Sequence, residues 1–156
     1  MDTKKKGTIT FRTTALLFAL SALFEFISLG TEVPLFGAIH GGLVATAYHL
    51  VYAVLYIGLG VGLWSAQRWA YPTVFAVTAV YTLDELQTMC SSRDVIVERL
   101  MQEIAGSPEL LQVVSKESML QMVLLVSAAF IACWWGFAWY THLRRDYFKP
   151  GAGHSS

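Results

Sequence analysis

Four long apolar stretches alternate with shorter polar segments along the chain. They run at about 13–30, 42–64, 69–88 and 118–141. A helix needs about 20 mostly apolar residues to cross the hydrocarbon core of a bilayer, and each stretch is close to that length. The pattern predicts an all-α integral membrane protein, built as a bundle of four transmembrane helices.

The composition supports the prediction of a membrane protein. The chain is 55% hydrophobic and 14% charged, whereas about a quarter of the residues in a soluble domain are charged. The formal net charge is zero, and no basic stripe is interleaved with aromatic residues, so we expect no binding to nucleic acid. The lipid bilayer is the first partner that the sequence indicates.

The distribution of Lys and Arg predicts the orientation in the membrane. Cytoplasmic loops carry an excess of these residues, and one orientation places eight of the eleven inside: Lys4, Lys5, Lys6, Arg12, Arg68, Arg144, Arg145 and Lys149. We therefore expect both termini in the cytoplasm and the loops 31–41 and 90–117 outside. The first span contains Glu25 and is followed by no cleavage signal, so we expect it to be retained.

These expectations divide the chain into three parts. They are a basic cytoplasmic N-terminus (1–12), a four-helix membrane domain (13–142) and a cytoplasmic tail (143–156) that is basic and then disordered. The outer loop 90–117 carries apolar residues at helical spacing, which predicts a short amphipathic helix at about 94–105. Gly106 would end it, and Ser107-Pro108 would start a second helix that continues into the fourth span.

Four ionisable residues are expected at one depth in the membrane. Counted at about 1.5 Å per residue from the cytoplasmic ends of their helices, Glu25 and His49 lie roughly 20–22 Å up. By the same count Asp84 and Glu85 lie roughly 22–24 Å up. Ionisable groups at such depth usually face the interior of the bundle or water, so this layer is the candidate site for ligand or ion binding.

The two adjacent carboxylates of YTLDELQTM (81–89) are predicted to differ. Glu85 shares a helical face with Thr78 and Thr82, so we expect it to point inward. Asp84 lies about 100° further round the helix. We expect Asp84 to turn toward the headgroups as an interfacial anchor, and Glu85→Gln to matter more than Asp84→Asn.

Two interpretations of the layer remain open. Glu25 and His49 could form a structural ion pair that only locks the first two helices. Alternatively, Glu25, His49 and Glu85 could form a functional cluster that relays protons, holds a cationic or polar small molecule, or coordinates a divalent metal through nitrogen and oxygen. No His-x-x-x-His spacing supports the metal, so its identity and that of any cofactor stay unknown.

Other chemistries are disfavoured by the positions of the reactive residues. His49 and His142 are expected near opposite membrane faces, which excludes a haem held by both. Cys90 and Cys133 are also expected far apart, so we predict free thiols rather than a redox pair. There is no plausible pairing of a nucleophile with a base and no phosphate-binding loop, and we expect no enzymatic activity.

The segment YIGLGVGLWSAQRWAYP (56–72) combines a glycine-rich span with a W-x-x-x-R-W-A turn. It resembles a pattern common in small prokaryotic four-helix membrane proteins. The resemblance implies a prokaryotic cytoplasmic (inner) membrane and carries no assigned activity. Gly58-x-x-x-Gly62 lies within it, and we expect this pair to serve packing inside the molecule rather than a dimer interface.

Two functions follow from these observations. The first is a non-catalytic accessory or assembly subunit of a larger membrane complex, with protein subunits or further copies of this chain as partners. The second is a unit that binds or transports protons, cations or a small ligand through the Glu25/His49/Glu85 layer.

Overall fold

The computed structural model describes residues 7–90 and 116–149 of the 156-residue chain. The helices in these ranges are α1 (Thr8–Ile27), α2 (Gly42–Trp64), α3 (Ala70–Met89) and α6 (Lys116–Leu143), followed by the 3-10 turn η1 (Arg145–Phe148). Strands β1 (Val33–Leu35) and β2 (Ala38–His40) join α1 to α2. Three helices, namely α1, α2 and nearly all of α6, are long and apolar enough to cross a membrane. The described fold is therefore mostly helical and of membrane type.

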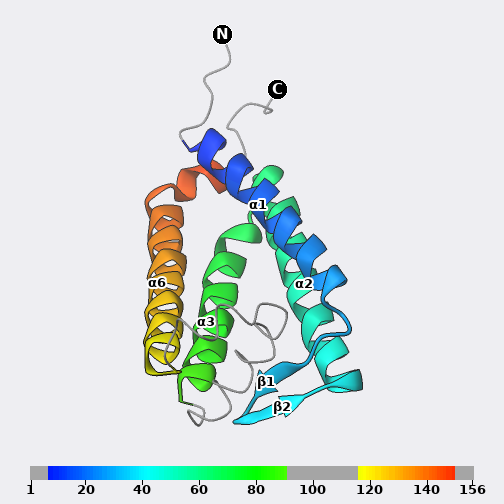
Figure 1. Cartoon of the computed structure of the whole chain (residues 1–156). Helices are drawn as coiled ribbons and strands as arrows, with labels where there is room; N and C mark the ends of the chain where they lie inside the picture. The colour runs from blue at the N-terminus through cyan, green and yellow to red at the C-terminus, as the bar shows by residue number, and fades with distance from the viewer. Residues whose placement is uncertain (1–6, 91–115, 150–156) are drawn as a thin grey trace, which may run out of the picture.

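The helices form two pairs, with α1 packed along α2 and α3 packed mainly against α6. Both pairs come together where η1 lies and where α1 begins, which we call the η1 end (Figure 1). At the opposite end, the hairpin end, the β-hairpin fills part of the space between the pairs (Figure 1). This arrangement gives the molecule two ends of different construction.

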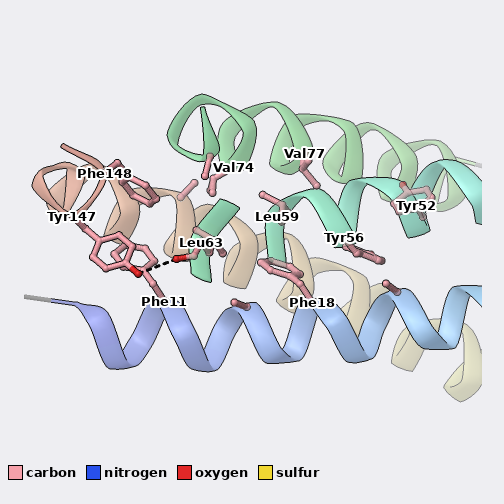
Figure 2. Packing of buried hydrophobic residues seen from close by; sticks show 14 residues of the cluster. Phe11, Phe18, Tyr52, Tyr56, Leu59, Leu63, Val74, Val77, Tyr147 and Phe148 are labelled. Carbon is pink, nitrogen blue, oxygen red and sulfur yellow. Dashed lines mark hydrogen bonds between the residues drawn. The ribbon is translucent and has the colours of Figure 1, made fainter. Parts of the chain in front are cut away.

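Aromatic side chains close the η1 end. Phe11 is fully buried, and its ring stacks on that of Tyr147 with centroids 4.5 Å apart. The Tyr147 hydroxyl donates a hydrogen bond to the carbonyl oxygen of Leu63 at 2.9 Å, which ties η1 to the end of α2 (Figure 2). Burial raises the pKa of Tyr147, so this hydroxyl stays protonated as a donor. The part of the tail nearest α6 thus belongs to the core.

Two glycines of α2 allow close packing, and they do so on different neighbours. A Cβ atom added to Gly60 would lie 3.3 Å from the carbonyl oxygen of Ala15 in α1. One added to Gly62 would lie 2.7 Å from the Cβ of Ala70 in α3. Gly58 has nothing within 4 Å of that position. The Gly58/Gly62 pair is therefore not one packing surface: only Gly62 packs inside the described molecule.

The first helix is shifted relative to the expected stretch 13–30. It begins at Thr8 and ends at Ile27, because Phe11 belongs to the core of the η1 end and the chain turns after Ser28. In that turn the backbone N–H of Thr31 donates to the carbonyl oxygen of Ser28 at 2.9 Å. The early end of α1 brings Thr31 to the ring of His49.

The prediction of an all-α chain overlooked the β-hairpin. Its turn residues Phe36 and Gly37 have φ values of 52° and 80°, as a two-residue type I′ turn requires. Gln87 of α3 holds the turn: its side-chain oxygen accepts from the N–H of Phe36 at 2.7 Å, and its amide donates to the carbonyl oxygen of Pro34 at 3.1 Å. Strands of three residues are too short to show an alternating pattern in the sequence.

Several expected segments lie outside the described residues. They are the basic residues 1–6, the amphipathic helix at about 94–105, the start of the next helix from 108 and the tail from 150 onward. The fourth helix is described from Lys116, two residues before the expected start of its span.

Candidate functional site

A cleft of about 670 Å³ lies at the hairpin end between the two helix pairs. All four residues of the predicted layer line it, although they come from three different helices: Glu25, His49, Asp84 and Glu85. The remaining described lining residues are Ser28, Thr31, Glu32, Val33, Pro34, Tyr48, Thr88, Val123 and Ser127. Among these described residues there is no Lys or Arg. The cleft is therefore polar and predominantly acidic.

Glu25 and His49 form the pair that one interpretation of the sequence expected. The Nδ1 atom of His49 lies 2.7 Å from Oε2 of Glu25, and His49 is only 7% exposed. On the other side of the ring, Nε2 lies 3.1 Å from the hydroxyl oxygen of Thr31. This hydroxyl is also 2.8 Å from the carbonyl oxygen of Ser28. Both nitrogens of the imidazole are thus satisfied by residues that line the cleft.

Asp84 is held by α2, so the prediction that it turns toward the headgroups is wrong. Its Oδ2 atom accepts hydrogen bonds from the hydroxyls of Tyr48 at 2.5 Å and Tyr52 at 2.8 Å. Its Oδ1 atom accepts from the side-chain amide of Gln87 at 3.2 Å. Three donors, two of them from α2, thus fix the position of the Asp84 carboxylate at one wall of the cleft.

The orientation of Asp84 was predicted wrongly because only one face of α3 was assumed to contact other helices. Its polar stripe faces α6, since the indole N–H of Trp135 donates to the hydroxyl of Thr82 at 3.1 Å. The neighbouring Tyr81 packs on Trp134 with ring centroids 5.3 Å apart. Asp84, about 100° further round, faces α2 instead. Glu85 lies on the stripe as expected and lines the cleft.

Three residues of the site were missed in the sequence. Thr31 was assigned to a loop, and its contact with His49 depends on where α1 ends. Tyr48 and Tyr52 did offer a signal, because they are one helical turn apart on α2. Counted from Trp64 at about 1.5 Å per residue, they lie roughly 24 and 18 Å up, on either side of the depth of Asp84. Matched depth on neighbouring helices could have suggested this contact.

The geometry supports some of the candidate chemistries more than others. In residues 7–90 and 116–149, no group of three or more His, Cys, Asp or Glu side chains is placed to hold a metal ion. The two cysteines are free and exposed, on α6 and just beyond α3. What the cleft offers is acidic oxygens around a space large enough for a small organic molecule, with a carboxylate–imidazole pair in its wall.

Comparison with known proteins adds one finding. A protein-family model described as "Predicted membrane protein (DUF2127)" matches residues 38–96, which is less than half of the chain. No curated protein and no solved structure matches. The chain is thus similar to predicted membrane proteins over α2 and α3, the helices that carry His49, Asp84 and Glu85. Glu25 and α6 lie outside the matched segment.

Proposed function

We propose that this protein is a non-catalytic membrane protein that binds a small organic cation in the cleft, as the binding step of its transport. One observation carries the proposal: four acidic side chains line the cleft, and its described lining contains no Lys or Arg. Besides Glu25, which is paired with His49, three further acids, Glu32, Asp84 and Glu85, line the cleft. Charge of one sign in a cleft with low-dielectric walls concentrates ions of opposite sign.

The size and lining of the cleft favour an organic cation. Its volume of about 670 Å³ falls within the range of about 300–1,000 Å³ that small-molecule sites occupy. Hydroxyl groups of Ser28, Thr88 and Ser127 add neutral acceptors beside the carboxylates.

We further propose a topology with four spans, both termini in the cytoplasm and the cleft facing outward, in a prokaryotic cytoplasmic membrane. Arg12, Arg68, Arg144 and Arg145 all belong to helix ends at the η1 end, which fits the excess of Lys and Arg in cytoplasmic segments. The guanidinium of Arg12 lies over the ring of Trp64, 5.3 Å from its centroid. In this orientation the aromatic core closes the cytoplasmic side while the cleft is accessible from outside.

Isothermal titration calorimetry on the detergent-purified protein tests the binding. The probes are ammonium ions of increasing size, from methylammonium to tetraethylammonium. We expect saturable binding by at least one of them, weakened at least about tenfold by Glu85→Gln, since loss of about 1.4 kcal/mol corresponds to that factor. Glu117→Gln is the matched control because Glu117 is an exposed acid of α6 outside the cleft. Equal affinity in both variants would reject the cleft as the site.

A second candidate function is the accessory subunit expected from the sequence. It is favoured by an apolar groove of about 540 Å³ between α1 and α2. Small residues, Ala15, Ala19 and Gly60, form part of this groove, and Leu16 and Trp64 are among its larger residues. Small residues allow the backbone of another transmembrane helix to approach closely. The groove therefore suits a helix of a partner subunit or of a second copy.

Filling the groove tests this second candidate. Ala19→Leu should abolish co-purification of a stoichiometric partner, or of a homo-oligomer, in mild detergent. Ala132→Leu, an equivalent change at an exposed position of α6, should leave the assembly intact. Recovery of a monomer from the unaltered protein would count against the accessory role.

A further inference from the structure

Thr31 lies between His49 and the end of α1, and its hydroxyl is within hydrogen-bonding distance of both. Its hydroxyl oxygen is 3.1 Å from Nε2 of His49 and 2.8 Å from the carbonyl oxygen of Ser28. A hydroxyl has one proton to donate and lone pairs with which to accept. The Ser28 carbonyl can only accept, and it already receives the backbone N–H of Thr31.

Two arrangements of protons fit these positions, and they differ by one proton. In the first, the Thr31 hydroxyl donates to Ser28 and accepts from Nε2–H of His49. One further proton then lies between Nδ1 and Oε2 of Glu25, which are 2.7 Å apart, and the pair as a whole is neutral. In the second, the Thr31 hydroxyl turns to donate to a bare Nε2, while Nδ1–H donates to the Glu25 carboxylate. The pair then carries one negative charge.

We propose that Glu25, His49 and Thr31 form a one-proton exchange unit in which rotation of the Thr31 hydroxyl accommodates gain or loss of the proton. The proton leaves from Nε2 through the cleft to the outer solution, and no heavy atom has to move. All hydrogen bonds of the ring persist in both forms, so the pair is suited to reversible exchange rather than only to locking α1 against α2. Thr31 is a positioning residue for His49.

The charges around this unit link proton loss to occupancy of the cleft. Glu32 follows α1, Asp84 and Glu85 come from α3, and Tyr48 precedes His49 on α2. The described cleft residues of α6, Val123 and Ser127, carry no charge. A cation held among these acids disfavours the neutral, protonated form of the pair and favours the negative one. This second half of the inference, exchange of one cation for one proton, rests on the proposed function.

Nitrogen-15 NMR of the histidine rings in lipid bilayers tests the unit directly. The signals of His49 are assigned by their loss in His49→Gln. We expect Nε2 to be protonated at low pH and bare at high pH, where the neutral ring keeps its proton on Nδ1. At high pH, a neutral ring with its proton on Nε2 would overturn the proposal, because in that form Nε2 cannot accept from Thr31.

Variants of Thr31 distinguish hydrogen bonding by its hydroxyl to His49 from packing of its side chain alone. Thr31→Val keeps the shape of the side chain and removes the hydrogen-bonding partner of Nε2 in both forms. A hydrogen bond from the charged ring is the stronger one, so the protonated form loses more and the midpoint of the His49 titration should fall by at least about half a pH unit. Thr31→Ser retains the hydroxyl and should leave the midpoint unchanged. Equal midpoints in all three proteins would contradict the role of the hydroxyl, whatever the effects on stability.

Titration with tetramethylammonium tests the coupling. Linkage requires that a cation which expels the proton also lowers the pH midpoint of His49, and that binding becomes tighter as the pH rises. If calorimetry shows binding in the cleft but the midpoint does not move, the coupling is wrong and the proposed function stands. If none of the ammonium probes binds, the proposed function fails, while the predicted tautomer of His49 is still decided by the NMR spectra.

Discussion

At the η1 end the two helix pairs meet through aromatic rings, whereas at the hairpin end they diverge around a polar cleft. Phe11 is fully buried at the first end and contacts four other rings, those of Phe137, Tyr140, Tyr147 and Phe148. At the second end Glu25 and Asp84 are held by hydrogen bonds, and each keeps part of its surface open to the cleft.

The comparison of the two ends shows how a small helical bundle can combine a polar cleft with an apolar core. Burying an ionisable group without partners is costly, and Glu25 and Asp84 both have hydrogen-bonding partners on α2. At the opposite end, aromatic contacts of Phe11 with η1 and α6 join the two pairs. Changes at the η1 end should therefore act on stability, whereas at the hairpin end a change at Asp84 should act on stability and a change at Glu85 mainly on binding.

The largest effect is expected at the η1 end. Phe11→Ala removes a fully buried ring and should lower the free energy of unfolding by about 3–5 kcal/mol, measured by denaturant titration in detergent. Phe36→Ala is the matched control, because Phe36 is 90% exposed at the tip of the hairpin. It should change stability by less than about 0.5 kcal/mol. Similar losses in both variants would show that the η1 end is not the stabilising core.

Asp84→Asn should have the next largest effect. It leaves one acceptor oxygen where there were two, so the new NH2 group faces either the two tyrosine hydroxyls or the side-chain amide of Gln87. The donors on that side lose their acceptor, at a cost of about 1–3 kcal/mol. Glu85→Gln should cost less stability. A double-mutant cycle with Tyr48→Phe checks the cause: the effects of the two changes should not add. Strict additivity would mean that the contact contributes nothing.

Two glycines of α2 give a narrower test of the packing between the pairs. Gly62→Ala places a methyl group 2.7 Å from the Cβ of Ala70 and should destabilise the protein by about 1–3 kcal/mol. Gly58→Ala adds the same group one turn earlier, where nothing lies within 4 Å, and should be neutral in the same unfolding measurement. A loss at Gly58 would instead indicate that this face is covered by a partner.

The smallest effect is expected for Gln87→Ala, which removes the bonds that hold the hairpin to α3. Each such hydrogen bond contributes about 0.5–1.5 kcal/mol, and we expect its removal to affect only the hairpin. Hydrogen exchange at the N–H of Phe36 should become faster, while the amides of α2 keep their protection. Faster exchange throughout α2 would contradict a purely local role.

The sequence predicts the features that a single helix fixes by itself, and it does not predict those that depend on neighbouring helices. The rise per residue is constant, so counting along each helix placed Glu25, His49, Asp84 and Glu85 at one depth, and the structure brings them around one cleft. Directions around a helix axis depend on its neighbours, which the sequence does not identify. Asp84 was therefore assigned to the headgroups although Tyr48 and Tyr52 hold it.

Contacts between distant segments were the least predictable. Tyr147 looked like part of a basic tail, and only the approach of η1 to α2 makes its hydroxyl a partner of Leu63. Similarly, the contact of Thr31 with His49 requires α1 to end before the apolar stretch does. In both cases the local sequence permits several conformations, and tertiary packing selects one.

Thiol labelling tests most directly whether the hairpin end holds a cation site and the η1 end is closed. Ser28→Cys in the cleft and Ala138→Cys in the buried core are compared in a background of Cys90→Ser and Cys133→Ser. A trimethylammonium thiosulfonate should label Cys at position 28 about tenfold faster than a sulfonate of similar size, and tetramethylammonium should slow it, while position 138 stays unreactive. Equal or faster labelling of position 28 by the anionic reagent would contradict the account.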